Sequence, residues 1–140
     1  MIVSNLGEYM TIFTPIEEHK ATGRVKKVFD NIKKERKIKA IPNFWKTIAN
    51  DPDTLERTWK SLKDIMKKGT VDTLTKEMIY MAVSMTNSCE YCIRSHTAAA
   101  KKKGMSDKML KELIAIVGMA NETNRLVESY QVEVDSFLKK

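Results

Sequence analysis

The chain of 140 residues contains only two cysteines, two histidines, three prolines and five glycines. It has no apolar run of the roughly 18 residues that a membrane-spanning helix needs. It also has no basic segment followed by a long apolar one at its start, as a signal peptide would. We therefore expect a cytoplasmic protein with no membrane partner. In that compartment a pair of cysteines is more often redox-active or metal-binding than a structural cross-link.

Signals for β-structure are missing as well. We find no hairpin turn, internal repeat, low-complexity tract or linker long enough to separate domains. Apolar residues instead recur at helical intervals along most of the chain. The sequence predicts an all-α fold of about six to seven helices. It should form one domain over residues 1–140, with residues 1–15 as an extended N-terminal arm.

The net charge of +7 is dispersed along the chain. The densest basic runs, residues 33–37 and 101–103, fall where helices should end, and cations are favourable there. No aromatic residues interleave with them, as they would in a groove that binds single-stranded nucleic acid. We interpret the runs as a solvated surface and expect no nucleic-acid partner. A helical nucleic-acid-binding module is the third alternative for function.

Capping residues predict where several helices begin and end. Asp51 followed by Pro52 should start one helix, and Gly69 should end it. Either Thr73 or Thr75 should cap the next helix.

Further along the chain, Ser88 and Ser106 should each cap a helix. The polar segment 121–124 predicts a break or kink. A last helix should then carry the apolar residues between Val127 and Leu138.

The helix predicted to follow residue 73 is apolar around most of its circumference, which is typical of a buried central helix. Glu77 stands out in it. At about 100° per residue, Glu77, Ser84 and Ser88 share one narrow polar sector. Glu77 is therefore either a functional carboxylate or an exposed first-turn glutamate that interacts with the helix dipole.

Cys89, Cys92 and His96 fall within about 60° of one another on one helix face. The positive end of the helix dipole favours a thiolate in the first turn, and the Cys-x-x-Cys spacing lets the two sulfurs bridge. His96 lies one turn beyond Cys92 and can accept its proton, and Glu77 can orient His96. These groups are what peroxide reduction through a sulfenic acid and a disulfide requires.

Two other interpretations of the motif stay open. Cys89, Cys92 and His96 are all possible zinc ligands, although no third cysteine is available to complete a structural site. The chain would then be a helical oligomeric binding protein. Alternatively, the cysteines are small buried hydrophobes. His19 lies in a polar stretch with no other ligand near it, so we expect it at the surface.

This segment resembles the alkylhydroperoxidase D-like (AhpD-like) branch of the carboxymuconolactone decarboxylase superfamily. The residues that carry the resemblance are Glu77, the run Cys89-x-x-Cys92-x-x-x-His96, the segment Gly104-Met-Ser-Asp107 and, as in peroxidase-related members, Pro42-Asn-Phe-Trp45 and Asn50-Asp-Pro-Asp53. The resemblance implies an all-helical subunit in trimers or hexamers. It also implies a thiol-dependent hydroperoxidase that needs no cofactor or metal. Its substrate would be a peroxide, and its partner a thiol or disulfide reductant protein.

The resemblance also assigns roles. It makes Cys92 the thiol that attacks peroxide, Cys89 its resolving partner, and Glu77 with His96 the proton relay. The helix dipole favours Cys89 instead, because Cys89 lies nearer the helix start, so which cysteine attacks first stays open. The best-known members have histidine where this chain has Tyr91, and tyrosine is a poor base at neutral pH. The decarboxylase branch does not depend on Cys-x-x-Cys, so decarboxylation is the less favoured alternative.

Overall fold

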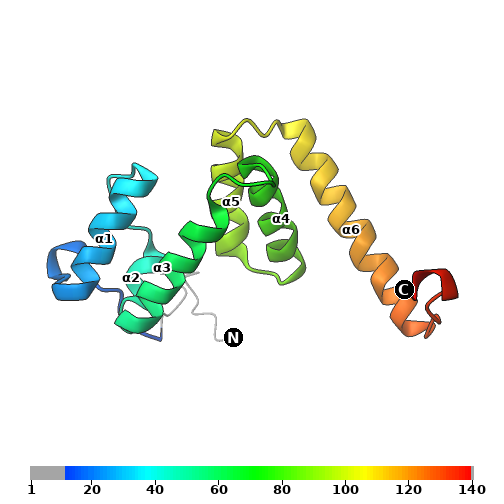
Figure 1. Ribbon diagram of the computed structural model, residues 1–140, viewed down its shortest axis with the longest axis horizontal. Coiled ribbons are helices and arrows are strands. Elements are labelled where there is room, and N and C mark those ends of the chain that lie inside the picture. The colour runs from blue at the N-terminus through cyan, green and yellow to red at the C-terminus, as the bar shows by residue number, and fades with distance from the viewer. Residues whose placement is uncertain (1–11, 140) are drawn as a thin grey trace, which may run out of the picture. The chain divides into compact units, whose positions relative to one another are not determined.

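The computed structural model describes residues 12–139, and all of the regular structure in that range is helical (Figure 1). The elements in chain order are η1 (Glu18–Lys20), α1 (Gly23–Arg36), α2 (Asn43–Ile48), α3 (Pro52–Met66), α4 (Thr73–Thr86), α5 (Glu90–Lys102), α6 (Asp107–Ser129) and η2 (Ser136–Leu138), where η marks a 3-10 helix. The all-α prediction is confirmed. Most of the predicted N-terminal arm, residues 1–11, lies outside the described residues.

The chain divides into two compact units, the first ending at Ile65 and the second beginning at Met66. The first holds α1, α2 and nearly all of α3, and the second holds α4, α5 and α6. The single domain expected over residues 1–140 stays a prediction.

Two tryptophans form the centre of the first unit. The rings of Trp45 and Trp59 are buried and meet edge to face, with their centroids 5.5 Å apart. Trp59 Nε1 donates a hydrogen bond of 2.7 Å to Asn31 Oδ1, which satisfies the one polar group of the indole. The apolar stripe of α1 packs in the same core, through Val25, Val28, Phe29 and Ile32. Phe44 lies beside Trp45 and is 38% exposed.

In the second unit, α4 packs against α5 and α6. Met81 and Ala100 are fully buried at the centre of this unit. An apolar stripe of α4 faces this core through Leu74, Met78, Met81 and Met85. The prediction of a buried central helix holds only in part for the single chain: Met81 is fully buried, but Ile79 and Val83 are each 55% exposed. Part of the apolar circumference of α4 therefore faces outward in the single chain.

Some predicted helix ends are correct. Pro52 begins α3, and Asp51 accepts hydrogen bonds from the Asp53 amide at 3.1 Å and the Thr54 hydroxyl at 2.6 Å. Ser106 caps α6 by accepting a hydrogen bond of 3.1 Å from the Met109 amide. Both side chains satisfy amides that the first turn of a helix leaves without a partner.

Other predicted ends are wrong. Asp72, not Thr73 or Thr75, caps α4, because its carboxylate accepts both the amide (2.9 Å) and the hydroxyl (2.5 Å) of Thr75. A carboxylate at this end is also favoured by the helix dipole. The helix before it, α3, ends at Met66, so Gly69 lies beyond its terminus.

The predicted break at residues 121–124 is absent, and α6 runs without interruption to Ser129. Asn121 donates to the Val117 carbonyl at 2.8 Å, and Thr123 donates to the Ala120 carbonyl at 3.1 Å. These side chains bond back along their own helix instead of competing with it. The predicted last helix is also wrong: the chain turns after Tyr130 and forms only the short η2.

No helix within residues 12–139 combines the length and apolar character that crossing a membrane would require.

Candidate active site

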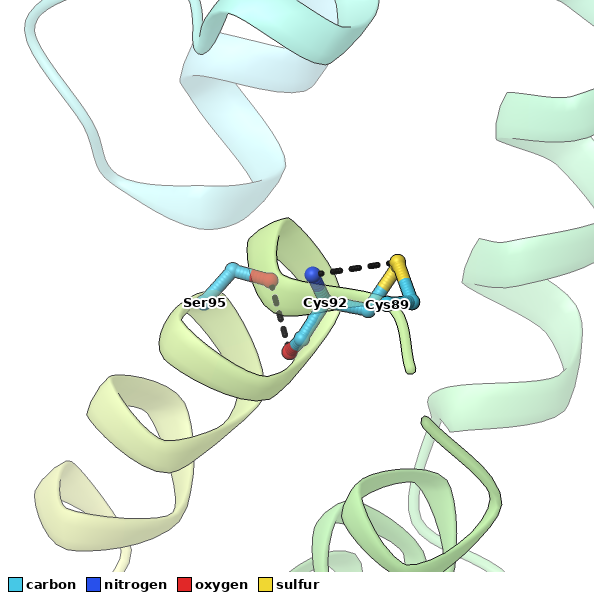
Figure 2. The surroundings of a disulfide bond; sticks show 3 residues. All are labelled: Cys89, Cys92 and Ser95. Carbon is cyan, nitrogen blue, oxygen red and sulfur yellow. Dashed lines mark hydrogen bonds between the residues drawn. A yellow bond between two sulfur atoms is a disulfide. The ribbon is translucent and has the colours of Figure 1, made fainter. Parts of the chain in front are cut away.

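Cys89 and Cys92 are joined by a disulfide at the start of α5 (Figure 2). Their Cα atoms lie 5.3 Å apart, within the normal range for a disulfide. The Cys92 amide donates a hydrogen bond of 3.4 Å to Cys89 Sγ, so the sulfur of Cys89 caps the helix. Ser88, which we expected to be the cap, lies instead in the preceding turn with φ of +55°. The motif therefore lies at a helix start, as predicted, but the helix begins one residue later than predicted.

The position of this pair has a chemical consequence. Both cysteines are partly exposed, so a reactant and a reducing partner can approach them. They also lie in or before the first turn of α5, where unpaired amides and the helix dipole stabilise negative charge. Reduction of the disulfide would therefore release thiols in surroundings that favour the thiolate.

Glu77 and His96 form a buried pair between α4 and α5. His96 Nδ1 lies 2.6 Å from Glu77 Oε2, and the two residues are only 8% and 5% exposed. An exposed first-turn glutamate is therefore the wrong interpretation of Glu77. When Nδ1 carries the ring proton and donates a hydrogen bond to Glu77, Nε2 is left with a lone pair that can accept a proton.

Lys103 is the second partner of Glu77. Its Nζ lies 2.5 Å from Glu77 Oε1, so the two carboxylate oxygens bond to two different residues. Burial is the largest influence on the Glu77 carboxyl and would raise its pKa. The hydrogen bonds from His96 and Lys103, with the charge of Lys103, outweigh burial and hold this pKa below its ordinary value of 4.5. Glu77 is therefore a carboxylate, not a carboxylic acid, at neutral pH.

Tyr80 covers one face of the imidazole. The Tyr80 and His96 rings are stacked, with their centroids 3.6 Å apart and their planes at 20°. Tyr80 lies one turn after Glu77 on α4, so the same helix supplies both the hydrogen-bond partner and the stacking partner of His96. The ring of His96 is thus held both at its edge and on its face.

The predicted site residues fall into two contact groups. Cys89 bonds to Cys92, and Glu77 bonds to His96, as expected. Within the described part of the chain, no hydrogen bond joins His96 to either sulfur. His96 is four residues after Cys92 on the same helix, so the imidazole and the sulfur are one turn apart.

Lys103 and Tyr80 are the residues that the sequence analysis missed. We interpreted residues 101–103 as a solvated basic run, but Lys103 pairs with a buried carboxylate. The missed signals were spacings: Lys103 is seven residues after His96, and Tyr80 is three after Glu77. Both spacings place two residues on one helix face. His19 is exposed, as expected.

A metal site finds no support in this geometry. Nowhere between residues 12 and 139 do three or more histidine, cysteine, aspartate or glutamate side chains gather as ligands for an ion. His96 directs Nδ1 at Glu77, and the two sulfurs are bonded to each other.

The fold and the site together define a class: a helical protein with a Cys-x-x-Cys disulfide at a helix start and a buried Glu–His pair one turn away. A model of the carboxymuconolactone decarboxylase family matches residues 52–132. The crystal structure of the alkylhydroperoxidase AhpD core from Rhodospirillum rubrum is similar to this structure, with a TM-score of 0.90 and 42% sequence identity. The similarity covers 94% of this chain and 99% of that one. The chain belongs to the carboxymuconolactone decarboxylase family, in its AhpD-like branch.

Two curated proteins are more distant relatives. An alkyl hydroperoxide reductase of Mycobacterium tuberculosis is 22% identical over 117 residues, which is 84% of this chain and 33% of that protein. An uncharacterized protein in the cox locus of Paracoccus denitrificans is 31% identical over 52 residues, 37% of this chain and 47% of that protein. The chain thus spans between a third and a half of the length of these relatives.

Proposed function

We infer that this protein is a thiol-dependent hydroperoxidase that reduces organic hydroperoxides through a Cys89–Cys92 redox couple. The observation that carries the proposal is the disulfide at the start of α5, with His96 one turn after Cys92 on that helix and hydrogen-bonded to Glu77 of α4. The names of an AhpD core and an alkyl hydroperoxide reductase among the similar proteins support it.

The proposed reaction begins with the reduced protein. Cys92 Sγ gives its proton to His96 Nε2 and attacks the terminal oxygen of the hydroperoxide. The O–O bond breaks, and Cys92 becomes a sulfenic acid. The leaving alkoxide takes the proton from His96 Nε2 and departs as an alcohol. Cys89 Sγ then attacks the sulfenic sulfur, water leaves, and the disulfide forms. The sum is one hydroperoxide and two thiols converted to one alcohol, one water and one disulfide.

A second protein must then reduce the disulfide. We expect a dithiol reductant, since thiol–disulfide exchange with a partner cysteine pair returns two electrons without any bound cofactor. The partial exposure of Cys89 and Cys92 suits such an exchange. The cytoplasmic location expected from the sequence stays a prediction.

The test is a free-thiol count on the reduced protein before and after one equivalent of cumene hydroperoxide, with zinc measured on the same sample. We expect two thiols per chain to be lost, with no stoichiometric metal. Two persistent thiols with about one zinc per chain would support the Cys/Cys/His metal site instead. Two persistent thiols without metal would overturn the redox proposal.

The roles of the two cysteines can be separated with matched variants. We expect Cys89→Ser to react once with peroxide and to accumulate a sulfenic acid at Cys92, detectable by dimedone labelling and mass spectrometry. We expect Cys92→Ser to form neither the sulfenic acid nor the disulfide. The reverse pattern would make Cys89 the attacking thiol, as the helix dipole alone favours.

The decarboxylase reaction for which the family is named is the second candidate, because the family model matches most of the second unit. That chemistry does not depend on a Cys-x-x-Cys pair. Lactone decarboxylation that survived in a Cys89→Ser/Cys92→Ser double variant would support this candidate over the peroxidase.

We also propose that the protein works as a homo-oligomer, a trimer or hexamer. Every residue from Glu122 to Lys139 is exposed in the single chain. The large apolar side chains in this stretch are Leu126, Val127, Tyr130, Val132, Val134, Phe137 and Leu138. An apolar surface of this kind is typical of a protein–protein interface, and a second copy of the chain is the occupant that we propose.

A further inference from the structure

Lys103 differs from the lysines beside it in what it contacts. Lys101 forms an ion pair with Asp107, both of them well exposed, and Lys102 is exposed and has no ion pair among the described residues. Lys103 extends inward to a carboxylate whose side chain is only 6% exposed, while its own side chain is 34% exposed. A lysine whose charge sits between solvent and a buried carboxylate can change the electrostatics of the site from outside it.

The backbone at the end of α5 holds Lys103 in this position. The Lys103 amide bonds to the Ala99 and Ala100 carbonyls at 3.2 and 3.0 Å, and the Met105 amide returns to the Ala100 carbonyl at 3.0 Å. Gly104 supplies the φ of +100° that this reversal needs. Lys103 is therefore placed by a helix terminus, and its Nζ bonds directly to Glu77 Oε1.

The contacts form a continuous line from the ammonium to the imidazole. Lys103 Nζ bonds to Glu77 Oε1, and Glu77 Oε2 bonds to His96 Nδ1 at 2.6 Å. Lys103 also neutralises the charge of Glu77. Without it, a buried carboxylate with a net charge would be compensated by an imidazolium, because an opposite charge within hydrogen-bond distance favours the protonated ring.

Resting on the proposed function, we propose that Lys103 is the positioning residue of this site. It orients the Glu77 carboxylate and supplies its counter-charge, so that Glu77 holds the Nδ1 edge of His96 and leaves Nε2 for the Cys92 thiol. Lys103 touches no reacting atom and acts through Glu77. The titratable groups nearest this network are Tyr80 on α4, which is stacked on the imidazole, Cys92, which lies one turn before His96 on α5, and Cys89 at the N-cap of that helix.

The first test follows the His96 imidazole by NMR as a function of pH in the reduced protein. In Lys103→Met we expect the midpoint of the imidazole titration to move to higher pH, by about one unit, as for loss of a nearby cation. Lys103→Arg should restore the wild-type midpoint, because it keeps the charge and a donor. Lys102→Met removes the same charge one residue away and should leave the midpoint unchanged. Equal midpoints in Lys103→Met and Lys102→Met would overturn the proposal.

A double variant is the control for a folding defect in Lys103→Met. Glu77→Gln removes the buried charge, so Lys103→Met in that background leaves no carboxylate without a partner. We expect the Lys103→Met shift to disappear there, because Lys103 acts only through Glu77. A shift of equal size in both backgrounds would show a general effect of surface charge and would overturn the proposal.

The pH dependence of peroxide reduction gives the second readout. If His96 accepts the proton of Cys92, the acid limb of the rate should move to higher pH in Lys103→Met by the same amount as the NMR midpoint. A limb that stayed in place while the midpoint moved would contradict the proton-acceptor role of His96 in the proposed function. The positioning role of Lys103 would still stand, because the NMR titration does not depend on activity.

Discussion

Glu77 is buried and ionised because it has two partners of different kinds. Lys103 supplies a full positive charge, and His96 supplies a ring N–H. A carboxylate with only one of these partners would keep one oxygen buried without a hydrogen bond, which costs free energy. At the scale of the single residue, the site therefore depends on one side chain that uses both of its oxygens.

This arrangement predicts a loss of stability in acid. The pKa of Glu77 is lower in the folded protein than its ordinary value of 4.5, so the unfolded chain takes up the proton first. The stability that Glu77 contributes is therefore complete above pH 4.5 and is lost as the pH falls from there through the folded pKa. Urea unfolding between pH 3 and pH 7 should show this loss in the wild-type protein.

Glu77→Gln is the variant that tests this link. At pH 7 we expect it to lower the free energy of unfolding by about 1.5–3 kcal/mol, as for a hydrogen bond to a charged group. The variant should also lose part of its stability difference between pH 7 and pH 3. Glu112→Gln, at an exposed position on α6, is the matched control and should keep the wild-type slope. A slope in Glu77→Gln equal to that of the control would contradict the linkage.

At the scale of the element, α5 positions three kinds of functional group: thiols, an imidazole and an ammonium group. The cysteines lie at its start, His96 in its middle, and Lys103 just after its end. The dipole of the helix suits this order, since a thiolate is favoured at the start and a cation at the end. The neighbouring helix α4 adds the carboxylate and the stacking ring.

The stability of α4 should depend on the residue that caps its N-terminus. Asp72 accepts two hydrogen bonds from Thr75, so Asp72→Ala removes both and also removes a favourable charge at the helix start. We expect a loss of about 1 kcal/mol in the free energy of unfolding, measured by thermal or urea denaturation. Asp72→Asn keeps an oxygen acceptor and should lose clearly less. Equal losses in the two variants would mean that charge, not capping, is responsible.

At the scale of the whole molecule, the second unit has more apolar surface than one chain can cover. Ile79 and Val83 on α4 are exposed, and so is every residue from Glu122 to Lys139. In Figure 1 the later part of α6 runs away from α4 and α5. Exposed apolar side chains in this number are typical of an interface, which is the basis for the proposed oligomer.

A double variant of α6, Leu126→Asp/Val127→Asp, tests the proposed oligomer. Two carboxylates buried at an interface would be strongly unfavourable, so we expect dissociation toward the 16.1 kDa chain in sedimentation velocity. Lys111→Asp changes charge at an exposed site earlier in the same helix and should leave the assembly intact. A wild-type protein that already sediments as a single chain would rule out the oligomer.

Features that depend on residues close in sequence could be predicted without the structure. The helical content follows from apolar spacing, as in the stripe from Val25 to Ile32 that packs into the core. The Cys89–Cys92 pair and its location at a helix start follow from spacing and turn signals. Even so, local signals failed where two patterns competed: the polar run at residues 121–124 bonds back along α6 instead of ending it.

Contacts between helices required the folded chain. Glu77 could be picked out as an unusual polar residue, but whether it was buried depended on which face of α4 met α5. The pairing of Lys103 with Glu77 joins residues that lie 26 positions apart, and no helical period relates residues on different helices. For the same reason, sequence periodicity predicted an apolar α4 but not which part of it stays exposed. Helical period and capping act over a few residues, whereas burial and charge pairing are set by packing between elements.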